Sequence, residues 1–164
     1  MMIQSMAGAK DLVAWLSAHK ILTALVTRNT QEAAMTFADL LLPHQFDVII
    51  GRDYSKDEGA SMLSNKPDPA LFHHIVGKWS TNPSDMIMVG DSLVNDVAFG
   101  KAAGAATALA DIGWRYLEDG KSNAVADVVV DKLVGLPRQL WGHFGILDDL
   151  GTNISQEVRH SGTN

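Results

Sequence analysis

Five short apolar runs constrain the fold of this chain more than any other feature of its sequence. They span residues 21–26, 47–50, 86–90, 105–110 and 127–130. Several of the segments between them place apolar residues at helical spacing, so strands and helices alternate along the chain. Short, continuously apolar strands are typical of parallel sheets that are covered by helices on both faces. The sequence therefore predicts an α/β protein with such a sheet.

Helical periodicity and capping residues predict the helices. They are expected over residues 7–19, from Asn29 or Thr30 onward, from Asp68 as N-cap with Pro69 as the first helical residue, from Asp91 to Gly104, and over residues 131–147 with a break near Pro137. A length of 164 residues with 46% hydrophobic content suits one domain. We expect this domain to span residues 1–147 and the polar residues 148–164 to form a flexible tail.

Charge and composition argue against several classes of function. The net charge of -6 argues against binding to nucleic acid or to an anionic membrane. The chain has no cysteine, so disulfides and thiolate metal sites are excluded. No run approaches the ~20 apolar residues that span a bilayer, and the first residues lack a signal-peptide pattern. A soluble, cytoplasmic protein is therefore expected.

Polar residues follow the first and third apolar runs, at the strand ends where parallel sheets bind their ligands. Thr27, Arg28 and Asn29 come after the first run, and Asp91 and Ser92 come after the third. A threonine hydroxyl beside backbone N–H groups at a helix start suits a phosphoryl oxygen. A residue that only begins the helix would give the same pattern, so both interpretations of Thr27 stay open.

Asp91 and Asp96 are candidates for binding Mg²⁺, which prefers one or two carboxylates with water and phosphate oxygens. The alternative is that Asp91 and Ser92 cap the following helix and that Asp96 lies in its solvated first turn. Lys66 is biased toward an extended conformation by Pro67, which fixes the direction of its ammonium group, and Arg28 would add positive charge. Taken alone, each basic residue is better explained as a solvated surface side chain.

Three segments together resemble motifs two, three and four of the haloacid dehalogenase-like (HAD) hydrolase superfamily, especially its small phosphoglycolate-phosphatase-like members. They are ALVTRN (24–29), KPDP (66–69) and VGDSLVNDVAFGKAAG (89–104). The resemblance extends from about Gly8 to about Val130. It implies a Rossmann-like parallel sheet and a Mg²⁺-dependent phosphomonoesterase that acts on a small phosphorylated substrate through an aspartyl-phosphate intermediate.

The resemblance also implies roles for the motif residues. Thr27 would bind the phosphoryl group, and Lys66 would steady the nucleophile and the phosphate, so both are candidate catalytic residues. Arg28 and Asn29 would complete the phosphate-binding site.

Motif four implies the metal ligands in the same way. Asp91 would hold Mg²⁺ and Asp96 would support it. The spacing of these two acids is the longer of two that the superfamily uses, so Asn95 is an alternative to Asp96.

One motif of the superfamily does not occur in this sequence. The covalent nucleophile and a second acid form an Asp-x-Asp pair at the end of a first strand, and none of the 164 residues belongs to such a pair. That strand lies in the superfamily's sheet between the strands that end at Thr27 and Asp91. We therefore expect a truncated core that lacks its first central strand and is unstable, rearranged or completed by another strand. The alternative is that the remaining strands close up directly, and exposed edges would favour self-association.

Two functions stay open. The first is a Mg²⁺-dependent phosphatase that is inactive in this form, because its nucleophile strand must come from a longer chain or a partner. The second is a catalytically dead pseudo-phosphatase that serves as a phosphate- and Mg²⁺-binding or interaction domain.

Overall fold

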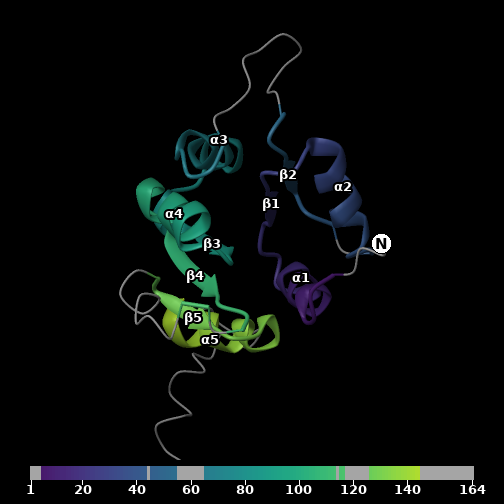
Figure 1. Cartoon of the computed structure of the whole chain (residues 1–164), viewed down its shortest axis with the longest axis vertical. Helices are drawn as coiled ribbons and strands as arrows, with labels where there is room; N and C mark the ends of the chain where they lie inside the picture. The colour runs from purple at the N-terminus through teal and green to yellow at the C-terminus, as the bar shows by residue number, and fades with distance from the viewer. Residues whose placement is uncertain (1–4, 44, 55–64, 114, 117–125, 145–164) are drawn as a thin grey trace, which may run out of the picture.

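Two parallel β-sheets form the centre of the computed structural model (Figure 1). The structure describes residues 5–43, 45–54, 65–113, 115–116 and 126–144, so the predicted tail at 148–164 lies outside the described residues. One sheet has the order β1-β2 and the other has the order β3-β4-β5, with every pairing parallel. The predicted α/β class, with parallel strands at all five apolar runs, is confirmed. The strands are β1 (Ala24–Val26), β2 (Val48–Ile50), β3 (Ile87–Gly90), β4 (Ala106–Ala110) and β5 (Val128–Val130).

Helices follow the strands in the predicted order. None of the helices in the described ranges is long and apolar enough to cross a bilayer. They are α1 (Ala9–Ala18), α2 (Gln31–Asp39), α3 (Ala70–Trp79), α4 (Ala98–Ala103) and α5 (Leu136–Phe144), with the 3₁₀ turns η1 (Pro83–Asp85) and η3 (Leu133–Gly135) and the π-helical turn η2 (Leu93–Val97).

The starts of α2 and α3 refine the predicted caps. The Thr30 side chain caps α2, so Thr30 and not Asn29 is the N-cap. Helix α3 begins one residue later than predicted, because Pro69 is its N-cap. Asp68 still satisfies the helix start, since its Oδ1 accepts a hydrogen bond from the Ala70 N–H at 2.9 Å.

Two other boundaries correct the prediction. Pro137 lies in the first turn of α5, where its missing N–H leaves no hydrogen bond unmade, so the predicted break near Pro137 is wrong. The first strand begins at Ala24 and not at Ile21. The Ile21 N–H donates to the Leu16 carbonyl at 3.0 Å, so the start of this apolar run belongs to the end of α1 and not to the strand.

Strands β1 and β3 are both sheet edges within the described part of the chain. The Thr27 N–H donates to the Ile50 carbonyl, so the even-numbered residues of β1 direct their backbone groups away from β2. The Met86 carbonyl accepts from the Ala106 N–H, so the odd-numbered residues of β3 direct theirs away from β4 in the same way. The two edges do not pair with each other, and the expectation that the remaining strands close up directly is wrong.

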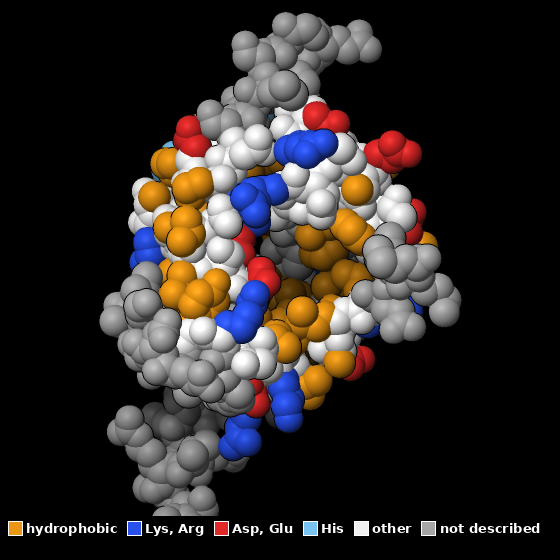
Figure 2. All heavy atoms as spheres, viewed as in Figure 1, with side chains coloured by type: hydrophobic (Ala, Val, Ile, Leu, Met, Phe, Trp, Pro, Cys, Tyr) orange, Lys and Arg blue, Asp and Glu red, His pale blue; other side chains and the backbone are white. Residues whose placement is uncertain are grey.

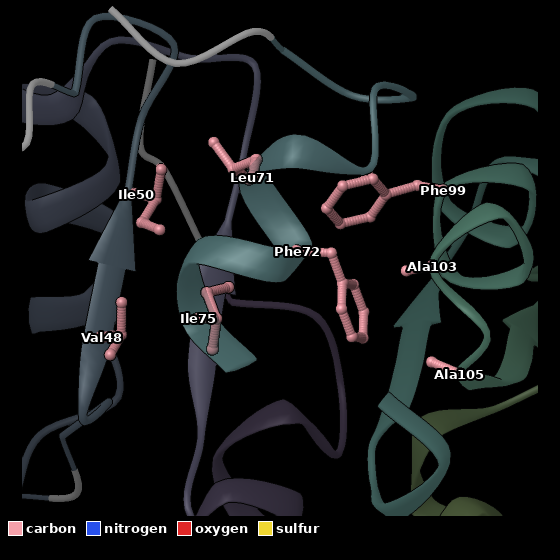
Figure 3. Close-up of a cluster of buried hydrophobic side chains, with 8 residues drawn as sticks. All are labelled: Val48, Ile50, Leu71, Phe72, Ile75, Phe99, Ala103 and Ala105. Carbon is pink, nitrogen blue, oxygen red and sulfur yellow. The ribbon is translucent and has the colours of Figure 1, made fainter. Parts of the chain in front are cut away.

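Helix α3 joins the two sheets through a hydrophobic cluster. Figure 3 shows Leu71 and Ile75 on the side of β2, and Phe72 beside Phe99 on the side of α4. The rings of Phe72 and Phe99 meet edge to face, with centroids 5.3 Å apart. A second cluster packs α5, together with Leu12 of α1, on the other face of β3-β4-β5. Helices therefore cover both faces of the larger sheet, as predicted.

Two aspartates lock neighbouring strands in register at their amino ends. Asp47 Oδ2 accepts from the N–H and hydroxyl of Thr23 at 2.7 and 3.2 Å. Asp127 Oδ2 accepts from the N–H and hydroxyl of Thr107 at 2.7 and 2.9 Å, and Lys101 pairs with its other oxygen. Burial raises the pKa of Asp127, but the hydrogen bonds from Lys101 and Thr107 outweigh it and hold the pKa below its ordinary 3.8.

We expect Asp127→Asn to lower the free energy of unfolding at pH 7 by about 1 kcal/mol, because the Lys101 ion pair is lost in a solvent-screened setting. Since the folded pKa lies below the unfolded one, this contribution is complete well above pH 4 and disappears as the pH falls through the folded pKa. Urea denaturation at pH 7 and pH 3 measures the difference. Asp131→Asn, just after β5, is the control, and an equal loss for Asp127→Asn at both pH values would contradict the prediction.

Candidate functional site

A pocket of about 710 Å³ opens at the carboxyl ends of the two sheets. It brings together all six residues that the sequence predicted for the site, although they come from three separate segments of the chain. Figure 2 shows basic side chains in the upper part of this face, above a hollow flanked by hydrophobic side chains. The residues that line the pocket are Thr27, Arg28, Asn29, Arg52, Asn65, Lys66, Asp91, Ser92, Asn95 and Asp96.

Lys66 and Asp96 form an ion pair within this pocket. The Lys66 Nζ lies 2.6 Å from Asp96 Oδ1, and the two side chains are only 10% and 7% exposed. The same ammonium donates to the Val26 carbonyl at 2.9 Å. Lys66 is therefore no solvated surface lysine, and it links the end of β1 to the turn that follows β3.

The second oxygen of Asp96 organises that turn. Oδ2 accepts from the N–H groups of Asp91 and Ser92 at 3.1 and 3.0 Å. Gly90 is required beside it, because a Cβ at that position would overlap the Asp96 carboxylate. The expectation of a solvated Asp96 is wrong, since the residue is buried. Both of its oxygens are engaged within the chain, so Asp96 positions Lys66 and the turn.

Asp91 presents the more accessible carboxylate of the pocket. Its side chain is 59% exposed, whereas Ser92, the residue after it, is the N-cap of η2. Arg115 Nη2 donates to Asp91 Oδ2 at 3.1 Å and to the Asp91 carbonyl at 3.0 Å, while its guanidinium lies over the ring of Tyr116. Sequence reasoning missed Arg115, because it belongs to none of the recognised motifs.

The loop between β1 and α2 is stabilised by side chains of the protein itself. Thr27 Oγ1 accepts from the Asn29 N–H at 3.2 Å, which leaves the hydroxyl hydrogen free to donate to an anion. The Gln31 N–H at the start of α2 donates to Asp53 Oδ1 at 2.6 Å. The side chains of Thr30 and Asp53 therefore satisfy N–H groups in the first turn of α2, so a bound anion would depend on Thr27 and the basic side chains.

Arg52 and Asn65 also line the pocket, and sequence reasoning assigned them no role. The Arg52 N–H donates to the Asn29 carbonyl at 2.8 Å, which ties the turn after β2 to the loop after β1. Gly51 permits this approach, because a Cβ there would overlap the backbone of Gln31. Because β1 and β2 are parallel neighbours, residues just after β2 are expected beside the loop after β1. This pairing is the signal that could have predicted Arg52.

The donor atoms of the pocket suit a hard cation that keeps much of its own hydration. The described residues contain no group of three acidic or histidine side chains that could hold a metal. Asp91 supplies an accessible carboxylate, whereas Asp96 has both oxygens engaged. Mg²⁺ is usually bound by one or two carboxylates with water and phosphate oxygens, so this donor set fits it.

Comparison with known proteins extends the likeness beyond the three motifs. A model of haloacid dehalogenase-like hydrolases matches residues 2–104. The chain is 37% identical over 147 residues to a haloacid dehalogenase-like hydrolase domain-containing protein of Arabidopsis thaliana, a match that covers 88% of this chain and 56% of the relative. It is 31% identical over 110 residues to phosphoglycolate phosphatase 1 of Pseudomonas aeruginosa, covering 66% of this chain and 38% of that protein. The chain thus spans about half the length, or less, of these curated relatives.

Solved structures show the same fold. A HAD phosphatase from Thermococcus onnurineus superposes with a TM-score of 0.68 at 24% identity, over 84% of this chain and 58% of that one. A beta-phosphoglucomutase from Clostridium difficile superposes with a TM-score of 0.59 at 21% identity, over 80% of this chain and 52% of that one. The Rossmann-like arrangement predicted from the sequence is confirmed by these neighbours.

Proposed function

The chain belongs to the haloacid dehalogenase-like hydrolase family, and on this basis we propose that its pocket is the phosphate- and Mg²⁺-binding part of a phosphomonoesterase site. The observation that carries the proposal is the convergence of Thr27, Lys66 and Asp91, from three motifs, on one pocket. The names of several relatives, phosphoglycolate phosphatases among them, support a small phosphorylated molecule as the substrate.

The described side chains divide the binding of a phosphoryl group among them. The Thr27 hydroxyl donates to one phosphoryl oxygen, and the Lys66 ammonium neutralises negative charge while Asp96 fixes its position. Asp91 is the proposed carboxylate ligand of Mg²⁺. When bound, the metal would neutralise the phosphate and stabilise charge that develops during transfer.

The proposed reaction also needs a carboxylate nucleophile. Asp96 is committed to Lys66 and to the turn after β3, and Asp91 is the proposed metal ligand, so neither is available to attack phosphorus. We propose that the nucleophile belongs to an Asp-x-Asp strand that sits between β1 and β3 and is supplied by a longer chain or a partner. In the part of the chain that the structure describes, β1 and β3 are both sheet edges, which supports this placement. The same edges support self-association when no such strand is bound.

A pseudo-phosphatase is the second candidate function. It is favoured by a specific observation: the sequence has no Asp-x-Asp pair, yet every predicted phosphate- and metal-binding residue lines the pocket. Such a protein would bind phosphate and Mg²⁺ without turnover.

We expect MgCl₂ and inorganic phosphate together to raise the melting temperature of the chain. A ligand at about 100 times its Kd adds about 2.7 kcal/mol to the free energy of unfolding. Asp91→Asn should abolish the Mg²⁺-dependent part of the shift, measured by differential scanning fluorimetry. Asp85→Asn, an exposed change outside the pocket, should leave the shift intact. No shift with either ligand would overturn both candidate functions.

A further inference from the structure

We infer that the substrate carries a second anionic group besides the phosphoryl group, and that Arg28 and Arg52 bind it. The second group is an oxyanion, either a carboxylate or another phosphate. This inference rests on the proposed function and names the substrate class of the same pocket.

The balance of charge in the pocket is the first step. Lys66 is paired with Asp96 at 2.6 Å, and Asp91 is paired with Arg115 at 3.1 Å. Arg28 and Arg52 also line the pocket, and neither makes an ion pair with a carboxylate of the described residues. Among the described residues, two guanidinium groups without a carboxylate partner therefore line one pocket of a chain whose net charge is -6. The phosphoryl contacts proposed for Thr27 and Lys66 include neither arginine.

The register of the smaller sheet places the two arginines together. Val26 of β1 is the partner of Ile50 of β2, and Arg28 and Arg52 each lie two residues beyond these partners. Both residues therefore follow the carboxyl ends of two neighbouring, paired strands. The hydrogen bond from the Arg52 N–H to the Asn29 carbonyl holds the two loops together at 2.8 Å. Paired guanidinium groups bind carboxylate or phosphate oxygens through forked, charge-assisted hydrogen bonds.

The layout of the pocket separates Arg52 from the proposed phosphoryl site, and Arg28 lies between the two, directly after Thr27. Lys66 bridges the end of β1 and the turn after β3, whereas Arg52 comes from β2, on the far side of β1. A volume of about 710 Å³ is also typical of sites for whole small molecules. A substrate held at Lys66 by its phosphate can thus extend toward Arg28 and Arg52 with a second anion.

Two phosphate esters that differ in one group test the inference. 3-Phosphoglycerate has a carboxylate where glycerol 3-phosphate has a hydroxymethyl group, and 1,3-propanediol bisphosphate offers a second phosphate. Titration calorimetry of the full chain with MgCl₂ should give about tenfold tighter binding for at least one of the doubly anionic esters than for glycerol 3-phosphate. The ester that is preferred tells whether the second oxyanion is carboxylate or phosphate.

Variants then assign the preference to the two arginines. Arg28→Gln and Arg52→Gln should each reduce this preference several-fold, and Arg52→Gln should leave the affinity for inorganic phosphate within about twofold. Arg52→Lys keeps the positive charge but loses the forked geometry of the guanidinium donors, so it should retain part of the preference for doubly anionic esters. Lys78→Gln removes an exposed positive charge on α3 outside the pocket and should change nothing.

The outcomes separate this inference from the function on which it rests. Equal affinity for all three esters would overturn the inference and leave the proposed phosphate site standing. A preference that survives in the double variant of Arg28 and Arg52 would overturn the assignment to these residues. Failure of the chain to bind inorganic phosphate or any ester would overturn both the inference and the proposed function.

Discussion

Asp96→Ala is expected to lower the free energy of unfolding by about 3–5 kcal/mol, because it leaves the buried Lys66 without its counter-ion. The Lys66 ammonium would keep the Val26 carbonyl but lose its counter-ion in a site where its side chain is only 10% exposed. The N–H groups of Asp91 and Ser92 would lose their acceptor at the same time. One substitution thus breaks an ion pair and opens the turn that holds the pocket together.

Substitution of the other member of the pair, Lys66, should lower the free energy of unfolding by less. Lys66→Met removes the cation, yet it leaves Asp96 with the two N–H donors of the turn, so its carboxylate is not bare. Urea denaturation of both variants and of the double variant gives the coupling energy of the pair. Asp85→Ala, at an exposed position in η1, is the control and should cost less than about 0.5 kcal/mol. A loss below about 1 kcal/mol for Asp96→Ala would show that the pair does not stabilise the fold.

The elements of the fold could be predicted because short apolar runs signal buried parallel strands in any context. The differences arise where tertiary contacts decide a boundary. Ile21 is as apolar as the strand that follows it, but its N–H closes the end of α1. Pro137 suggested a break, but a proline in the first turn of a helix has no intrahelical hydrogen bond to lose. Sequence periodicity carries neither kind of information.

The pocket could be predicted in part for a different reason. Thr27, Lys66 and Asp91 follow from strand ends and motif spacing, and the structure brings them to one pocket. The engagement of both Asp96 oxygens could not be predicted, because it depends on how the chain turns after Gly90. Arg115 and Arg52 reach the site through loops whose paths no local pattern specifies.

The two open edges connect the fold to the proposed chemistry. β1 and β3 are both parallel edges, their carboxyl ends both reach the pocket, and Lys66 spans from one to the other there. A strand placed between them would gain backbone partners on both sides and would end at the pocket. Its last residues would then lie where the proposed reaction needs a carboxylate.

Supplying such a strand is therefore expected to produce the largest change in activity. An apolar segment that ends in Asp-x-Asp-x-Thr, joined to the amino end of the chain, should raise Mg²⁺-dependent hydrolysis of p-nitrophenyl phosphate by at least about 10³-fold over the chain alone. Hydrogen exchange should show new protection at the even-numbered residues of β1 and the odd-numbered residues of β3, whose backbone N–H groups point away from β2 and β4. The matched control ends in Asn-x-Asn: it should give the same protection without activity, because it fills the edges but lacks the nucleophile. Protection without activity in the Asp-x-Asp form would favour the pseudo-phosphatase, whereas activity in the chain alone, or activity that survives Asp91→Asn, would refute the proposed mechanism.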